Sequence, residues 1–155
     1  MKIELTQGKV ALVDEDVFEE LSKHKWHLHG RYAARWMRVA GKRSVVFMHR
    51  QILGCKSDQQ VDHKNGVTLD NRRNNLRLAT PTQNSRNAKK AAGVSSRFKG
   101  VSWDKRRGSW LVQIQKRFIG RFKSELAAAN AYDRKARELF GEFARLNEAV
   151  MDVVG

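Results

Sequence analysis

One segment of the chain constrains the fold most strongly, because two short strand patterns are followed at once by a capped helix. Residues 60–63 and 76–79 resemble short strands, and a turn-rich loop joins them. In the second, Leu76 and Leu78 alternate with Arg77, so one face packs against the core. Thr80 can cap a helix, Pro81 suits its first position, and Gln83 completes a capping box. We therefore expect a β-hairpin followed directly by a helix.

Four polar residues of this segment carry chemistry: Asp62, His63, Asn75 and Asn84. An imidazole near its ordinary pKa can act as a general base at neutral pH, and the oxygens of a carboxylate and a carboxamide suit a hard divalent cation. The N-terminus of the helix also favours a docked phosphate. Adjacent residues of a regular strand point to opposite faces, so we expect the chain to bend at Asp62 and His63, close to Gly66.

With these residues, the stretch from about 45 to 90 resembles the HNH endonucleases, especially phage and intron-encoded homing enzymes with the ββα-metal fold. The resemblance implies that His63 is the general base and that Asp62 and Asn84 hold one Mg²⁺ or Mn²⁺ ion. It implies that Asn75 braces the loop and orients His63. Asparagine stands at the third position of the motif, a variant that the family also uses, so no zinc is expected.

Three further residues are weaker site candidates. His49 could touch phosphate or pack around the site, and Arg77 alternates with leucines, so it faces either solvent or phosphate. Asn87 lies farther along the same helix as Asn84. The histidines between residues 24 and 29 lack a second group of ligands, so we do not expect them to bind a metal.

The charge of the chain favours a nucleic-acid partner. The 155 residues include 31 Lys and Arg against 16 Asp and Glu, a formal net charge of +15, which attracts phosphate polyanions. Residues 97–123 contain nine basic residues and one acidic residue, whereas residues 124–155 contain four basic and six acidic ones. We expect a polyanion to meet the first of these stretches.

Other features of the sequence indicate where in the cell the protein is located. No apolar run reaches membrane-spanning length, so we expect no membrane partner. The only cysteine, Cys55, cannot form an intramolecular disulfide, and the chain does not open with a secretory signal. We therefore expect a cytoplasmic protein, in the host cytosol if a phage encodes it.

The C-terminal third predicts a three-stranded antiparallel sheet packed on one helix. Three strand-like stretches, 98–103, 108–115 and 118–122, are separated by short turns. Ser124 can cap a helix that ends near Gly141, and alanines on one side of that helix would let it lie close to the sheet.

This part of the chain resembles the APETALA-type domain of ethylene-response factors, which also occurs fused to HNH nucleases. The matching pieces include Trp110 to Ile114, Ile119-Gly120, and Leu146-Asn147. The resemblance implies that the sheet enters the major groove of double-stranded DNA. Ser102 and Gln115 stand where arginines are usual, so base preference does not transfer. Our candidates for DNA contact are Lys99, Trp103, Arg106, Arg107, Gln113, Gln115 and Arg117.

The expected fold class is α+β, in a series of small units. We expect an N-terminal mixed unit at 1–47, the ββα-metal nuclease at 48–90, a linker at 91–96 and the DNA-binding domain at 97–148. The leading hypothesis is a metal-dependent DNA endonuclease that nicks or cuts both strands and uses no small-molecule cofactor. A DNA-binding regulator with an inactive nuclease fold and an RNA-binding protein are the alternatives, and the oligomeric state stays open.

Overall fold

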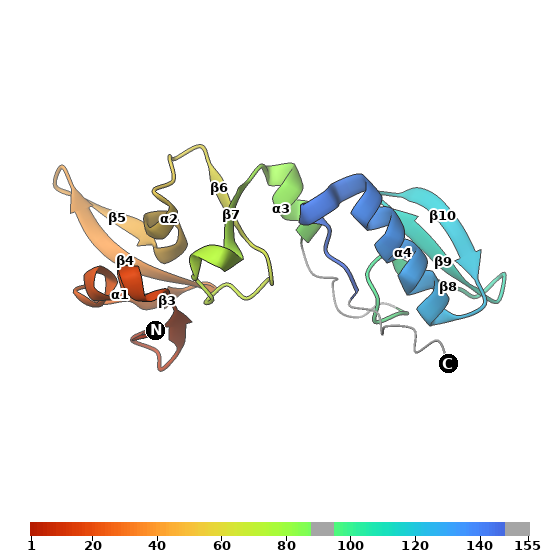
Figure 1. Ribbon diagram of the computed structural model, residues 1–155, viewed down its shortest axis with the longest axis horizontal. Coiled ribbons are helices and arrows are strands. Elements are labelled where there is room, and N and C mark those ends of the chain that lie inside the picture. The colour runs from red at the N-terminus through yellow and green to blue at the C-terminus, as the bar shows by residue number, and fades with distance from the viewer. Residues whose placement is uncertain (88–94, 148–155) are drawn as a thin grey trace. The chain divides into compact units, whose positions relative to one another are not determined.

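The computed structural model describes residues 1–87 and 95–147, and it confirms a mixed α+β fold with several small sheets. The chain divides into two compact units, Met1–Asn84 and Ser85–Gly155 (Figure 1). Most of the expected linker, together with residues 88–90 and 148 of the flanking expected domains, lies outside the described residues. No helix in the described part of the chain is long and apolar enough to cross a membrane.

The first unit contains three small antiparallel sheets, ordered β1-β2, β3-β4-β5 and β6-β7. Its elements, with α3 continuing past Asn84, are β1 (Lys2–Glu4), β2 (Val10–Leu12), α1 (Glu15–Ser22), β3 (His27–His29), β4 (Tyr32–Val39), β5 (Lys42–Phe47), α2 (Met48–Leu53), β6 (Gln60–His63), the 3₁₀ helix η1 (Arg73–Asn75), β7 (Leu76–Ala79) and α3 (Pro81–Asn87).

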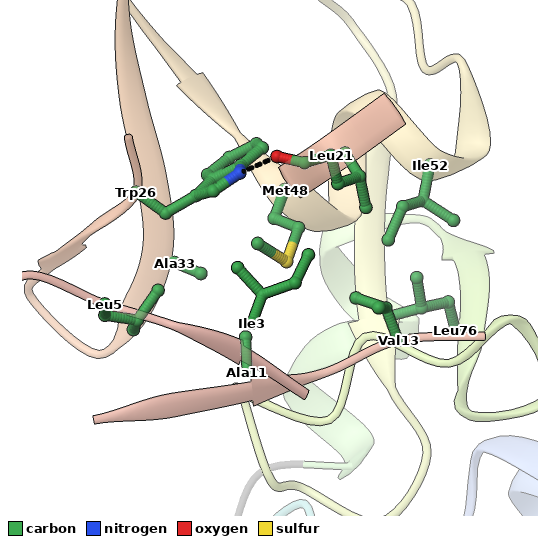
Figure 2. Close-up of a cluster of buried hydrophobic side chains, with 10 residues drawn as sticks. All are labelled: Ile3, Leu5, Ala11, Val13, Leu21, Trp26, Ala33, Met48, Ile52 and Leu76. Atoms are coloured by element: carbon green, nitrogen blue, oxygen red, sulfur yellow. Dashed lines mark hydrogen bonds between the residues drawn. The ribbon is translucent and has the colours of Figure 1, made fainter. Parts of the chain in front are cut away.

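One hydrophobic core holds the first unit together (Figure 2). Trp26 is its largest fully buried side chain, and the indole Nε1 donates a hydrogen bond to the Leu21 carbonyl at 2.8 Å, so its one polar atom is satisfied. Ile3 and Ala11 reach this core from β1 and β2, and Leu76 reaches it from β7. The core therefore extends across the boundary that we expected after residue 47.

The second unit contains a three-stranded antiparallel sheet, ordered β10-β9-β8, and one long helix that packs on it (Figure 1). The Ser124 hydroxyl accepts a hydrogen bond from the Ala127 amide at 3.4 Å, and Gly141 ends the helix, both as the sequence predicts. The elements are β8 (Val101–Asp104), β9 (Ser109–Ile114), β10 (Arg117–Phe122), α4 (Glu125–Phe140) and the 3₁₀ helix η2 (Gly141–Phe143).

Small residues allow α4 to approach the sheet. Ala128 and Ala136 are fully buried against a core that includes Val112. Gly100 lies so close to the Tyr132 ring that an added Cβ would be 2.1 Å from it. The close contact and the positive φ of 73° together explain why glycine occupies this position.

Candidate active site in the β6–β7–α3 segment

The hairpin of β6 and β7 places Asp62 opposite Arg77 and His63 opposite Leu76. Strand β6 stays regular through His63, so the expected bend at these two residues is wrong. The chain turns only after His63, where the Gly66 amide, at a φ of 68°, donates to the His63 carbonyl at 2.8 Å. Asp62 and His63 therefore point to opposite faces of the hairpin, as strand alternation dictates.

On one face, the buried Asp62 carboxylate forms an ion pair with Arg77. Arg77 Nη2 and Nε lie 2.7 and 2.9 Å from Asp62 Oδ2. Both side chains are nearly buried, at 5% and 10% exposure. The negative charge of Asp62 is thus already compensated by a cation from the neighbouring strand, and a metal ion would have to compete with that cation.

Asn84 lies on α3, and its side chain reaches the same hairpin. The capping box that the sequence predicts is confirmed: the Thr80 amide donates to Gln83 Oε1 at 2.8 Å, and the Gln83 amide donates to Thr80 Oγ1 at 3.2 Å. Asn84 Nδ2 donates to Gln60 Oε1 at 3.3 Å. Gln60 and Asp62 are two residues apart on β6, so they share a face. The helix therefore brings Asn84 to the side of the hairpin that carries Asp62.

On the opposite face, the His63 ring is buried, with 5% of the residue exposed. Its Nε2 lies 3.3 Å from Asn71 Oδ1. The Asn71 amide group donates through Nδ2 to the Leu69 carbonyl, which fixes its orientation and turns Oδ1 toward the imidazole. This arrangement favours the tautomer of His63 with the proton on Nε2 and the basic lone pair on Nδ1.

Burial also tunes the basicity of the imidazole. The pKa of His63 is lowered, mainly because the charged form loses hydration, although the hydrogen bond with Asn71 and the charge of Asp62 act in the other direction. A lowered pKa keeps His63 neutral, the form that a general base requires.

His49 is packed against His63. The two ring centroids are 5.2 Å apart, and the rings of Tyr32 and Phe47 lie 5.1 and 5.6 Å from His49. Burial, followed by the charges of His63 and Arg50, lowers the pKa of His49 to about 3. Its buried Nδ1 has no hydrogen-bond partner among the residues described. His49 is thus a neutral packing neighbour of His63.

Asn75 braces the loop between the two strands. Its Oδ1 accepts from the Asn65 amide at 3.0 Å, and its Nδ2 donates to the Asp70 carbonyl at 2.7 Å. Asp70 is held in turn by Arg72, and the same contact lowers the pKa of the Asp70 carboxyl. Asn75 thus ties the two ends of the loop at Asn65 and Asp70.

The sequence did not single out Asn71 as a site residue. Its position beside Asp70 indicated only a turn, and the contact with His63 depends on the folding of the whole loop. Asn87, a weaker candidate, is buried at the end of α3.

The residues that could hold a metal ion are few. The described residues contain no group of three or more His, Cys, Asp or Glu side chains with metal-binding proximity. One carboxylate and one carboxamide, on Asp62 and Asn84, are oxygen donors of the type that Mg²⁺ accepts while keeping several water molecules. The donor chemistry therefore fits a hard cation such as Mg²⁺ or Mn²⁺.

In the second unit, strand register sorts the candidate DNA contacts into two sides of the sheet. Gln113 is exposed and pairs with Phe118, on the side away from α4. Trp103 shares the side of the core residue Val101 and packs edge-on against Trp110 at 5.0 Å. Gln113 and Trp103 therefore lie on opposite faces of the sheet, so they cannot both belong to one DNA-binding face.

The remaining candidates lie mainly in turns. Gln115 is exposed in the tight turn between β9 and β10, and Arg117 follows that turn at the start of β10. The amides of Arg106 and Arg107 donate to Asp104 Oδ1 at 3.1 and 3.3 Å. Lys99 is only partly exposed, just before β8.

Arg121 was not among the candidates for DNA contact that the sequence suggested. It pairs with Leu111 in the register of the sheet. It therefore lies on the same side as Gln113, and its Nη2 is 3.5 Å from Asp104 Oδ2. Because β10 contains a register shift between Phe118 and Gly120, counting residues along the sequence could not assign Arg121 to this side.

Comparison with known proteins places the chain in a family. The HNH endonuclease family model matches residues 49–86, which include β6, β7 and nearly all of α3. A protein described as an uncharacterized HNH endonuclease of Acanthamoeba polyphaga mimivirus is 36% identical over 148 residues, covering 92% of this chain and 76% of that protein. Protein 3.8 of Escherichia phage T7 is 38% identical over 88 residues, 55% of this chain and 73% of that protein. No solved structure matches the chain. The chain therefore belongs to the HNH endonuclease family.

Proposed function

We propose that this protein is a metal-dependent DNA endonuclease that hydrolyses phosphodiester bonds with His63 as the general base. One observation carries the proposal. The β6–β7–α3 segment brings Asp62 and Asn84 to one face of a hairpin. On the other face, at the end of β6, a hydrogen bond holds His63 and favours one tautomer. The family match covers this segment.

Asp62 and Asn84 would hold one Mg²⁺ or Mn²⁺ ion. When bound, the cation supplies positive charge to the scissile phosphate and to the leaving oxygen. In the complex with DNA, Arg77 would exchange Asp62 for a phosphate oxygen, a partner that suits a guanidinium group. Arg77 thus neutralises Asp62 in the free protein and binds substrate in the complex.

His63 would accept the proton of the attacking water on Nδ1. Asn71 would keep the other ring nitrogen protonated, so that the lone pair stays on the atom that receives the proton. Asn75 would act through the backbone of the loop, which it ties at both ends.

The sheet of the second unit would hold the DNA, as its resemblance to an APETALA-type domain suggests. Gln113 and Arg121 lie on the side of the sheet away from α4, and Arg106, Arg107, Gln115 and Arg117 lie in or beside the turns. Arginine side chains at such positions suit contacts to phosphate, which position a protein on a duplex. Lys99 and Trp103 would have lesser roles because neither belongs to this side of the sheet.

One observation favours a second function, that of a DNA-binding regulator with an inactive nuclease fold. Asp62 is neutralised by Arg77 and His63 is buried, so the hairpin is satisfied without metal or substrate. In that case the same residues would serve stability alone.

Incubation with supercoiled plasmid and Mg²⁺ or Mn²⁺ separates the two functions. We expect the natural protein to nick or linearise the plasmid and His63→Ala to bind DNA without cutting it. His24→Ala is the matched control, because His24 is an exposed histidine outside the site, and it should cut normally. Equal binding without cleavage by all three proteins would instead identify a regulator.

A further inference from the structure

The β4–β5 hairpin of the first unit carries an unusual concentration of positive charge. The hairpin, residues 32–47, contains four basic side chains and no acidic one. Three of them, Arg38, Lys42 and Arg43, lie near the turn of the hairpin and are exposed. This cationic hairpin belongs to the same compact unit as the candidate active site and is separate in sequence from the basic sheet of the second unit.

The strand register places like charges opposite each other. Arg38 pairs directly with Arg43 across the two strands. Lys42 pairs with Val39 in the next position, so it lies on the other face of the hairpin. Like charges directly opposite on antiparallel strands repel each other and destabilise the pairing. Because no carboxylate occurs between residues 31 and 50, that segment itself provides no neutralising partner. An external polyanion would relieve the repulsion.

Arg43, one of the two facing arginines, packs over an aromatic ring. The Arg43 guanidinium lies 3.9 Å from the centroid of the Trp36 ring, and His27 stacks on the same indole at 5.6 Å. Such contacts reduce the conformational freedom of a long cationic side chain before it meets a partner. Trp36 nevertheless remains 45% exposed, so the surface is not covered by the described part of the protein.

A chain of ring contacts connects the hairpin with the candidate active site. Tyr32 lies 6.0 Å from His63 and 5.9 Å from Phe47, as measured between ring centroids. Phe47 lies 5.7 Å from His29, which lies 6.4 Å from Trp36. These contacts all lie within the first unit. The base of the hairpin, at Tyr32 and Phe47, therefore packs beside the imidazole that we propose as the general base.

We propose that the β4–β5 hairpin is a second DNA-binding element, which lies against duplex DNA beside the scissile phosphate, with Arg38, Lys42 and Arg43 on backbone phosphates. A two-stranded ribbon fits the major groove of B-DNA, whereas the deep, narrow major groove of an RNA helix would exclude it. The inference rests on the proposed function for the identity of the polymer. It adds a binding surface on the catalytic unit itself.

The test removes the three cations together. The variant Arg38→Ala/Lys42→Ala/Arg43→Ala is compared with Lys2→Ala/Lys9→Ala/Lys25→Ala, which loses the same charge from exposed positions elsewhere in the unit. Binding to a fluorescein-labelled duplex of mixed sequence is measured by anisotropy over a range of salt concentrations in EDTA, so that no cleavage occurs.

We expect the hairpin variant to bind at least about ten-fold more weakly than the control variant, and its salt slope to fall by about 0.9 for each phosphate that it no longer neutralises. Equal affinities and slopes for the two triple variants would overturn the inference. So would a natural protein that binds single-stranded DNA or an RNA duplex as tightly as duplex DNA. If the triple variant does not fold, Arg38→Gln/Lys42→Gln provides the same comparison against Lys2→Gln/Lys9→Gln.

The catalytic proposal is tested separately, because His63→Ala should retain the binding of the natural protein. Loss of binding in the hairpin variant would support the DNA-binding element even if His63→Ala still cut DNA. Cleavage that depends on His63, combined with hairpin and control variants that bind equally, would support the catalytic site and overturn the DNA-binding element.

Discussion

Asp62 and Arg77 face each other across the β6–β7 hairpin, and two hydrogen bonds from the arginine reach the same carboxylate oxygen. This ion pair stabilises the fold and also occupies the carboxylate that we propose as a metal ligand. The protein stabilises a buried carboxylate with an internal cation, and the proposed metal would replace that cation. Under our proposal, the strength of the ion pair would set how readily Asp62 accepts a metal ion.

Replacing Arg77 should lower stability and strengthen the response to metal. Arg77→Ala leaves a buried carboxylate without this partner, which costs about 3 kcal/mol of unfolding free energy. Removal of the competing cation should also let Mn²⁺ raise the melting temperature of the variant more than that of the natural protein. Thermal unfolding with and without MnCl₂ measures both effects. Arg72→Ala, which removes the partner of Asp70 instead, should show no extra gain from Mn²⁺.

Asn71 should affect catalysis through the His63 tautomer. Asn71→Ala removes the acceptor of the Nε2 proton, so we expect kcat to fall by up to about 10²-fold, the lower range of a general-base contribution, with little change in KM. Asn71→Asp keeps an acceptor and should recover part of the rate. Imidazole ¹⁵N shifts should report a mixed tautomer in Asn71→Ala. An unchanged tautomer would contradict this role.

Acid should destabilise the fold through His49. The unfolded chain binds a proton on this residue near pH 6.5, whereas burial lowers the folded pKa to about 3. The unfolded state therefore gains protons first as the pH falls. Stability from this group is complete above pH 6.5 and is lost toward pH 3, at up to about 1.4 kcal/mol per pH unit. Urea unfolding at several pH values measures the slope, which should become smaller in His49→Phe.

Close packing at Gly100 should make the second unit sensitive to a single methyl group. In Gly100→Ala the new Cβ would lie 2.1 Å from the Tyr132 ring and 2.8 Å from the Gln113 carbonyl oxygen. We expect a loss of about 3 kcal/mol or more, because backbone strain adds to overpacking. Gly108→Ala shares the positive φ but meets no atom within 4 Å. Calorimetry should therefore show a much smaller loss for Gly108→Ala.

The turn between β8 and β9 should contribute to DNA affinity. Arg106→Ala/Arg107→Ala removes two exposed cations from the proposed DNA-binding sheet. We expect weaker binding and a salt slope lower by about 0.9 for each phosphate that the two arginines bind, with metal affinity unchanged. Anisotropy titrations against salt, together with Mn²⁺ calorimetry, check this. An unchanged salt slope would show that this turn does not meet the phosphates.

Local sequence determined the parts of the fold that depend on neighbours in the chain. The capping box of Thr80 and Gln83 fixes the start of α3, and Ser124 fixes the start of α4, because these hydrogen bonds span only three residues. The motif residues from Asp62 to Asn84 also identified the family that the comparisons show.

Tertiary structure decided which of these side chains meet. The partner of Asp62 follows from cross-strand register, and the contact of His63 with Asn71 follows from the path of a loop. Neither has a periodic signal in the sequence. Register also separated Trp103 from Gln113, and long-range packing joined the N-terminal strands and β7 in one core. Sequence patterns report short-range hydrogen bonds and apolar periodicity, whereas contacts between distant segments depend on how the whole chain buries its apolar surface.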